Sequence, residues 1–382
     1  MAQKKKTHLR FLHCSDIHLD SPFTGLTAEK SEDRRRVLRS SFLRLMQYIR
    51  ESNIDVVLMS GDVFDTKYAT NTTAEVLIRE FKNCPDTDFI ISPGKNDYYT
   101  DNPIYTSGRL PKNCYVFSSD SLSRFDFQDN NITVYGWAFM GEKMTHNPII
   151  DRHIDDSSRV NILCAYADLN GPVTSDSCPI SSQDLKRFGA DFYALGSHHE
   201  AGRFVTIGAS KYCYCGSLEC TGFDDPGLGG ASLITIDYED GELSIENKSI
   251  SFGHVRFKTE VLDITGVNTG NEIINRISRM ISDKKYDHET ALRVNLVGSV
   301  DPRFSVPKNI ESDAFGLYFF QLVDKTLPTY ETASLKRDMS VKGELFRKFL
   351  PDIESEDEEI SLKAARAFRI ALAAVENREQ EI

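Results

Sequence analysis

Short apolar runs alternate with helical patterns over roughly the first 250 residues, and this alternation constrains the fold more than any other feature. Apolar residues between the first two runs recur every three or four positions, as on one face of a helix: Val37, Leu38, Phe42, Leu45, Met46 and Ile49. Strands that alternate with helices indicate an α/β architecture. The runs that we interpret as buried strands are 9–13, 56–60, 89–92, 132–136, 161–166 and 192–196.

The rest of the chain changes character twice. From about 204 to 250 the predicted strands lie closer together, with turns such as EDGE, which favours an antiparallel or mixed sheet. Residues 255–330 follow the order strand, helix, strand, short helix, strand, and from 331 the sequence becomes polar and then helical. We therefore expect a mixed α/β protein with three domains, 1–254, 255–330 and 331–382.

Charge and composition exclude several classes of protein. The chain has 382 residues and a net charge of −12, which excludes a generally cationic nucleic-acid coat but not a local basic groove or carboxylates offset by metal ions. Its eight cysteines include no CxxC pair, so a zinc ribbon is unsupported. No signal-like segment or membrane-spanning apolar run is visible, so we expect a cytoplasmic protein with reduced thiols and no membrane contact.

Polar residues gather where the predicted strands end. In open α/β sheets the carboxyl edge is where ligands bind. Asp16 and His18 are two positions apart, so in an extended segment their side chains would point the same way. Carboxylate oxygens mixed with imidazole nitrogens suit Mn²⁺, Fe²⁺ or Zn²⁺ rather than Ca²⁺, and such ions activate water and neutralise phosphoryl groups. The polar segments are 15–20, 61–65, 94–97, 166–168 and 197–200.

The order of these segments resembles a known family. D-x-H, G-D-x-F-D, a loop similar to G-N-H-D and an element similar to G-H-x-H are typical of the calcineurin-like metallophosphoesterases. The segments LHCSDIHLDSPF, VVLMSGDVFD, YALGSHHEAG and YCGSLECTGFDDPGLGGASLITID are similar to its DNA-repair exonuclease branch, the SbcD-type nuclease subunits. The resemblance covers nearly the whole chain. It implies a four-layer α-β-β-α sandwich, a small DNA-facing capping domain at 255–330, and a C-terminal segment that binds a partner.

The resemblance also implies a first metal site with all of its ligands present: Asp16, His18, Asp62 and His199. A second metal would share Asp62 and take the residues at 95, 166 and 197. Those positions are Lys95, Tyr166 and Ser197, and none is a good ligand for a divalent ion. The family's proton-donating histidine falls on Asn96, which cannot do that work near neutral pH. We therefore expect one divalent ion, Mn²⁺ before Fe²⁺ or Zn²⁺, a doubtful second ion, and weak or absent hydrolysis.

Lys95 has several interpretations. Charge arithmetic suggests that its ammonium group takes the place of the second metal and pairs with Asp62. Lys95 could instead be a solvated loop residue. A one-residue slip of the loop would make Asn96 the ligand, and His198 could rotate in for Ser197.

The resemblance implies DNA ends and an SMC-like ATPase of the SbcC type as partners, with a possible homodimer. Phe346, Phe349, Leu350 and the helix at 360–376 would bind the ATPase, or else pack against the chain's own core. Arg34–Arg36 would be a solvated helix start or a phosphate contact, and Tyr98–Tyr99 would pack in a loop or stack on a base. An alternative function is an active phosphatase or phosphodiesterase on small phosphoester substrates.

Overall fold

The computed structural model describes residues 7–23, 28–156, 158–223, 225–239, 242–301, 304, 306–307, 312–328 and 332–375. The chain divides into two compact units, Met1–Arg256 and Phe257–Ile382. The second unit includes the strand-and-helix segment predicted at 255–330 together with the helical segment predicted at 331–382.

Two six-stranded sheets form the first unit. In the first sheet β1, β2, β3 and β4 run parallel to one another, and β13 and β14 add an antiparallel hairpin beside β1. Its order is β14 (Glu242–Ser251), β13 (Gly230–Glu239), β1 (Thr7–Cys14), β2 (Val56–Met59), β3 (Asp88–Ile91), β4 (Cys114–Val116). The order of the second is β11 (Val205–Ile207), β12 (Ser210–Tyr214), β10 (Phe192–Gly196), β7 (Val160–Tyr166), β6 (Ile132–Gly136), β5 (Ser123–Phe127). A short pair, β8 (Asp168–Leu169) and β9 (Pro179–Ile180), follows the carboxyl end of β7.

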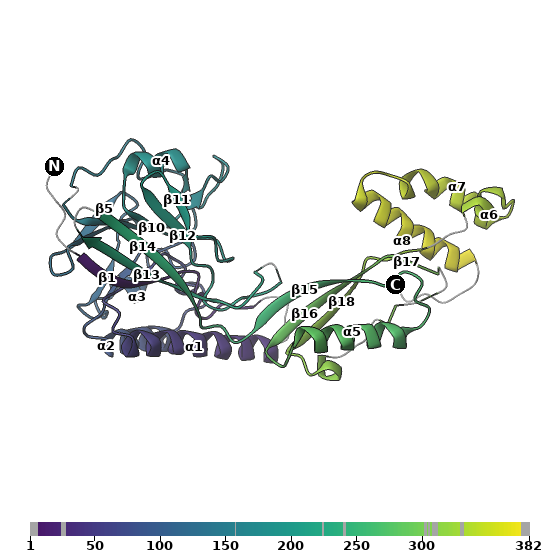
Figure 1. The fold of residues 1–382 in the computed structure, drawn as a ribbon, viewed down its shortest axis with the longest axis horizontal. Helices are drawn as coiled ribbons and strands as arrows, with labels where there is room; N and C mark the ends of the chain where they lie inside the picture. Colours follow the sequence, from purple (N-terminus) through teal and green to yellow (C-terminus); the bar gives the residue numbers. More distant parts are fainter. Residues whose placement is uncertain are drawn as a thin grey trace. The chain divides into compact units, whose positions relative to one another are not determined.

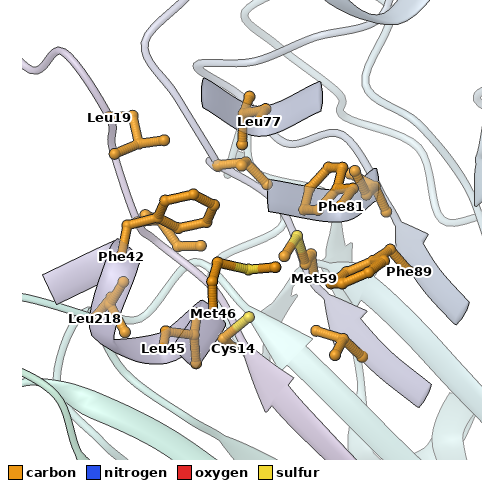
Figure 2. Packing of buried hydrophobic residues seen from close by; sticks show 14 of the residues in the cluster. Cys14, Leu19, Phe42, Leu45, Met46, Met59, Leu77, Phe81, Phe89 and Leu218 are labelled. Carbon is orange, nitrogen blue, oxygen red and sulfur yellow. The ribbon is translucent and has the colours of Figure 1, made fainter. Parts of the chain in front are cut away.

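The two-residue period of a strand explains how the layers pack. Val57 and Met59 of β2 face the helices α1 (Ala28–Glu51) and α2 (Asn71–Lys82), whereas Val56 and Leu58 face the second sheet. Figure 2 shows the helix side of this sheet, where Phe42 and Met46 of α1 and Leu77 and Phe81 of α2 pack together over Met59 and Phe89.

The outer face of the second sheet packs against α4 (Ser182–Phe188). Leu163 and Tyr193 lie on this face, with Leu185 and Phe188 of the helix. Helix, sheet, sheet and helix therefore follow one another, with α1 and α4 on opposite sides of the unit (Figure 1). This confirms the predicted α/β class and the α-β-β-α layering. The remaining helix of this unit is the short α3 (Pro103–Thr106).

The first part of the second unit follows the predicted order of elements. Ile273, Ile277 and Ile281 of α5 are buried against Leu292 and Val294 of β16. A three-stranded sheet has the order β15–β16–β18, and a two-stranded sheet pairs β17 with β19. The elements are β15 (Arg256–Asp263), α5 (Gly270–Lys284), β16 (Thr290–Val297), β17 (Ser299–Val300), the 3₁₀ turn Ser312–Phe315, β18 (Phe319–Asp324) and β19 (Leu327–Pro328).

Three helices end the described chain: α6 (Thr332–Arg337), α7 (Val341–Ile353) and α8 (Glu358–Val375). Phe368 is fully buried, with ring centroids 5.4 Å from Phe346 and 5.9 Å from Phe349. Phe346, Phe349 and Leu350 therefore pack into a core of their own helices, which is the second of the two alternatives weighed from the sequence. Across the part of the chain that the structure describes, none of the helices combines the length and apolar character needed to cross a membrane.

Candidate metal centre

The loops after β1 and β2 interlock at the carboxyl edge of the first sheet. The backbone N–H of Asp16 donates to the carbonyl of Gly61 (3.0 Å), and that of His18 donates to the carbonyl of Asp62 (2.9 Å). Asp16, His18 and Asp62 all have left-handed backbone, with φ of 49°, 51° and 52°. The sequence suggested an extended segment here, and that prediction is wrong. Aspartate and histidine tolerate this conformation better than bulkier residues, and it is frequent at functional sites.

Three side chains converge over this edge. Asp16, His18 and His199 each bring one potential ligand atom within 4.8 Å of the others. The two histidine Nε2 atoms are 3.3 Å apart, and His199 Nε2 is 3.8 Å from Oδ1 of Asp16. Asp62 adds Oδ2 at 3.8 Å from His18 Nε2. Side chains from three separate strand ends thus form one cluster.

The neighbours of these side chains determine which atoms remain for a ligand. Nδ1 of His18 lies 2.7 Å from Oδ1 of Asp65, so we assign a proton to Nδ1, which donates to that carboxylate, while Nε2 faces the cluster. Oδ2 of Asp16 accepts from Ser15 Oγ (2.5 Å) and from the Ser197 N–H (3.2 Å). Oδ1 of Asp16 is buried and has no hydrogen-bond partner among the described residues.

Burial and charge shift the pKa values within the cluster. Burial raises the pKa of Asp16 to about 6, helped by the neighbouring Asp62 carboxylate. Burial lowers the pKa of His18, but the hydrogen bond that His18 donates to Asp65 and the surrounding carboxylates outweigh it and raise that pKa to about 10. Burial, followed by the His18 charge, lowers the pKa of His199. Negative charge held in a buried place favours either protons or a cation, so a bound divalent ion would displace protons here.

The donor set fits a divalent transition metal. A carboxylate oxygen with no other partner and two imidazole nitrogens are the ligand types that Mn²⁺, Fe²⁺ and Zn²⁺ accept. Three protein ligands leave positions open for water or a phosphoryl oxygen. Asp62 is a less available fourth ligand, because its Oδ1 accepts the Asn96 N–H (2.7 Å) and its Oδ2 accepts from Asn96 Nδ2 (2.9 Å).

Lys95 does not pair with Asp62. Its Nζ donates to Oδ1 of Asp176 at 3.0 Å, and Lys143 lies 3.4 Å from the other oxygen of that carboxylate. The expected Lys95–Asp62 pair is therefore wrong. Asn96 already occupies both oxygens of Asp62, while Asp176 offers the ammonium group a partner that leaves it hydrated. Asn96 lies at Asp62, as a one-residue shift of the loop would place it, but it donates hydrogen bonds there.

Tyr166 fills the space beside Asp62. A Cβ added at Gly61, where φ is +93°, would lie 2.5 Å from its ring, and one added at Gly94 would lie 2.8 Å from it. Burial, together with the charge of the Asp62 carboxylate, raises the pKa of the Tyr166 hydroxyl well above its usual value of 10. The phenol therefore stays protonated.

Ser197 and His198 have partners other than Asp62. Ser197 Oγ donates to the carbonyl of Ala167 at 3.1 Å. His198 stacks on Tyr214, with ring centroids 4.1 Å apart, and its Nε2 lies 3.6 Å from Asp168. Neither side chain takes the place of a second-metal ligand.

Sequence reasoning missed the role of Asp97. This buried carboxylate accepts the N–H groups of Gly94 (2.6 Å), Asp62 (3.0 Å) and Val63 (2.9 Å) and the hydroxyl of Tyr105 (2.6 Å). Burial and the Asp62 charge raise its pKa to about 7. Asp97 therefore joins the loop after β3 to the loop after β2. The sequence feature that could have revealed this role is the position of Asp97, which is the last residue of the third polar segment, 94–97.

The arginines and tyrosines singled out from the sequence have different surroundings. Arg34 is buried against Glu219 (3.4 Å) and donates to the carbonyl of Cys220. Arg35 and Arg36 lie at the surface and pair with carboxylates one turn earlier in α1. Tyr98 and Tyr99 pack, partly buried, against the hydrophobic cores.

Comparison with known proteins points to one family. The sequence profile described as calcineurin-like phosphoesterase matches residues 9–200. The chain is similar to YhaO of Bacillus subtilis, described as an uncharacterized metallophosphoesterase, with 24% identity over 250 residues that cover 63% of this chain and 60% of that protein.

It is also similar to the DNA double-strand break repair protein Mre11 of Methanopyrus kandleri, with 20% identity over 295 residues that cover 71% of this chain and 63% of that protein. The chain therefore spans less than two thirds of the length of these two relatives. A solved dimetal phosphatase from Danio rerio matches 64% of this chain and 99% of its own, with 10% identity and a TM-score of 0.40, and at that score it carries no argument.

Proposed function

This chain belongs to the calcineurin-like phosphoesterase family, and from that premise we propose that it binds DNA ends at a single-metal centre and hydrolyses phosphodiesters slowly or not at all. The likeness to a DNA-repair protein supports the choice of DNA over small phosphoesters.

One observation carries the proposal: the ligand atoms of a single site converge, while the positions expected to hold a second ion turn elsewhere. Asp16, His18 and His199 face one another. Lys95 and Ser197 donate instead to Asp176 and to the Ala167 carbonyl, and the ring of Tyr166 packs against Gly61 and Gly94. Two-metal hydrolysis stabilises the attacking and the leaving oxygen with separate ions, and a single ion can bind a phosphate without doing both.

The residues of this chain would have distinct roles. Asp16, His18 and His199 would bind the ion, which supplies a Lewis acid for a phosphoryl oxygen, and Asp65 would keep Nε2 of His18 available to it. Asn96 lies beside the centre but cannot protonate a leaving group near neutral pH. The centre therefore has the groups to bind a phosphate, and Asn96 supplies no proton for fast cleavage.

The C-terminal helices support a protein partner as part of the same proposal. Although their aromatic residues form a core, Val341, Ile360 and Ile370 expose 66%, 47% and 45% of their surface. We propose the SMC-like ATPase as that partner.

The test combines a metal count with DNA assays on the full chain. The protein dialysed against Mn²⁺ should contain one ion per chain, bind DNA ends, and release nucleotides only slowly. Asp16→Asn should lose the ion and the DNA ends together. Asp129→Asn, which removes an exposed carboxylate in the β5–β6 turn, should change neither.

Two tightly bound ions with rapid DNA cleavage would contradict the single-metal centre. Rapid cleavage of p-nitrophenyl phosphate without DNA binding would favour a small-molecule phosphatase.

A further inference from the structure

An open pocket of about 370 Å³ lies between α1 and the beginning of α2, and neither the metal centre nor the proposed reaction uses it. We propose that this pocket binds a backbone phosphate of a single DNA strand whose end lies at the metal centre. The inference rests on the proposed function, since it names the strand that the centre would receive.

Three arginines give the pocket its character. Arg35, Arg36 and Arg39 line it together with Asp20, Pro22, Glu32, Tyr68, Thr70 and Thr72. Three guanidinium groups against two carboxylates leave this lining with an excess of positive charge, in a chain whose net charge is −12. Guanidinium groups match the geometry of phosphate oxygens and can donate two parallel hydrogen bonds to them.

The ion pairs of these arginines leave donors for a ligand. Arg35 lies 2.8 Å from Glu32 and Arg36 lies 3.4 Å from Asp33, and both are surface pairs one helical turn apart. Pairs of this kind contribute little to stability, and each guanidinium has five N–H donors. Arg39 is anchored by Asp20 at 2.9 Å, which fixes one side of the pocket.

The beginning of α2 adds hydrogen-bond donors at the same place. Thr70 is the N-cap residue of this 12-residue helix, and Thr70 and Thr72 line the pocket. The carboxylate of Asp20 accepts from the Thr73 hydroxyl in the first turn, so it already offsets part of the positive end of the helix dipole. The threonine hydroxyls add to the arginines and would not make a site alone.

Tyr68 connects the pocket to the metal centre. A second pocket of about 90 Å³ is lined by Asp65 and Asn96, which contact His18 and Asp62, and also by Lys67 and Tyr68. Tyr68 lines both pockets and is 49% exposed. A strand that leaves the metal centre therefore meets an exposed aromatic ring, on which a base can stack, before it reaches the arginines.

The experiment measures DNA binding, so it does not depend on cleavage. Single-stranded phosphorothioate DNA of uniform length is titrated into the Mn²⁺-loaded full chain at several salt concentrations. Arg35→Gln/Arg36→Gln is compared with Arg44→Gln/Lys82→Gln. The control removes two exposed positive charges outside the pocket, one from each of the helices that border it, α1 and α2. We expect the first variant to bind about tenfold more weakly, with a salt slope reduced by about one, and the second to match the unchanged protein. Both variants should keep their metal, which shows that they fold.

Replacement by lysine separates charge from geometry. Arg35→Lys/Arg36→Lys should keep the salt slope and recover only part of the affinity, because an ammonium group lacks the planar fork. Equal binding by the two glutamine variants would overturn the pocket while leaving the proposed function in place. If the unchanged protein bound no DNA, the proposed function would fail together with this inference.

Discussion

Asp16 and His18 each place one polar atom on a neighbour and keep the other for the centre. Nδ1 of His18 bonds to Asp65, and Oδ2 of Asp16 is bonded by Ser15 and Ser197. The atoms that remain, Nε2 of His18 and Oδ1 of Asp16, are those of the cluster. Hydrogen bonds with Ser15, Ser197 and Asp65, which would not contact the ion, therefore determine which atoms of Asp16 and His18 remain for it.

Asp65→Asn tests this arrangement. The amide can accept from Nδ1 but has no charge to raise the basicity of the ring, so the affinity for Mn²⁺ should fall by about 10- to 100-fold. Titration of the metal-free protein with Mn²⁺ measures it, and Asp129→Asn is the matched control. An unchanged affinity would show that Asp65 does not orient His18.

His13 gives the first unit a pH-dependent stability. It is fully buried in β1 with Nε2 2.6 Å from Ser60 Oγ, and burial lowers its pKa from 6.5 to about 3. The unfolded chain therefore binds a proton below pH 6.5 that the folded chain refuses, so stability is complete above pH 6.5 and falls as the pH drops toward 3. Between pH 6.5 and 5.0 this costs about 2 kcal/mol.

His13→Gln should remove that part of the pH dependence, whatever the variant's absolute stability. Urea unfolding of the metal-free protein at both pH values, compared with the unchanged protein, measures the difference. Equal pH slopes for the two proteins would exclude His13 as the source.

At the scale of elements, the sequence predicted the strands better than the contacts between loops. Apolar runs specify β1, β2, β3, β7 and β10 because burial requires them, and the polar segments follow from where those strands end. Lys95 was assigned to the wrong carboxylate because its partner Asp176 comes from the segment between β8 and β9, 81 positions away. The local sequence around Lys95 or Asp176 does not predict that they pair. Nor does the sequence around Asp97 predict the four donors that bond to its carboxylate.

The packing of α7 on α8 leads to a prediction about the C-terminal helices. Phe368→Ala removes a fully buried ring that packs on two phenylalanines, and should lower the stability of these helices by about 3–5 kcal/mol. Ile370→Ala, at a position that is 45% exposed on the same helix, should cost far less. Urea unfolding followed by circular dichroism measures both. Equal losses would mean that Phe368 is not in a core.

At the scale of the whole molecule, all residues of the candidate centre lie in the first unit. The chain divides after Arg256. Both six-stranded sheets precede that point, as do Asp16, His18, Asp62 and His199. Residues 1–256 alone should therefore fold and bind one Mn²⁺ with nearly the affinity of the full chain. Metal analysis and a Mn²⁺ titration of the two proteins check this. A fragment that folds but binds no metal would show that the second unit completes the centre.

The position of Tyr166 limits how this centre could change during evolution. Its ring belongs to the hydrophobic core, packs against Gly61 and Gly94, and lies close enough to Asp62 for that carboxylate to raise the pKa of its hydroxyl. A histidine there would be smaller than the ring it replaces and would leave part of that space unfilled. It would also find Lys95, Asn96 and Ser197 still unsuited to a second ion. A histidine at this position alone would therefore cost packing in the core without completing a second metal site.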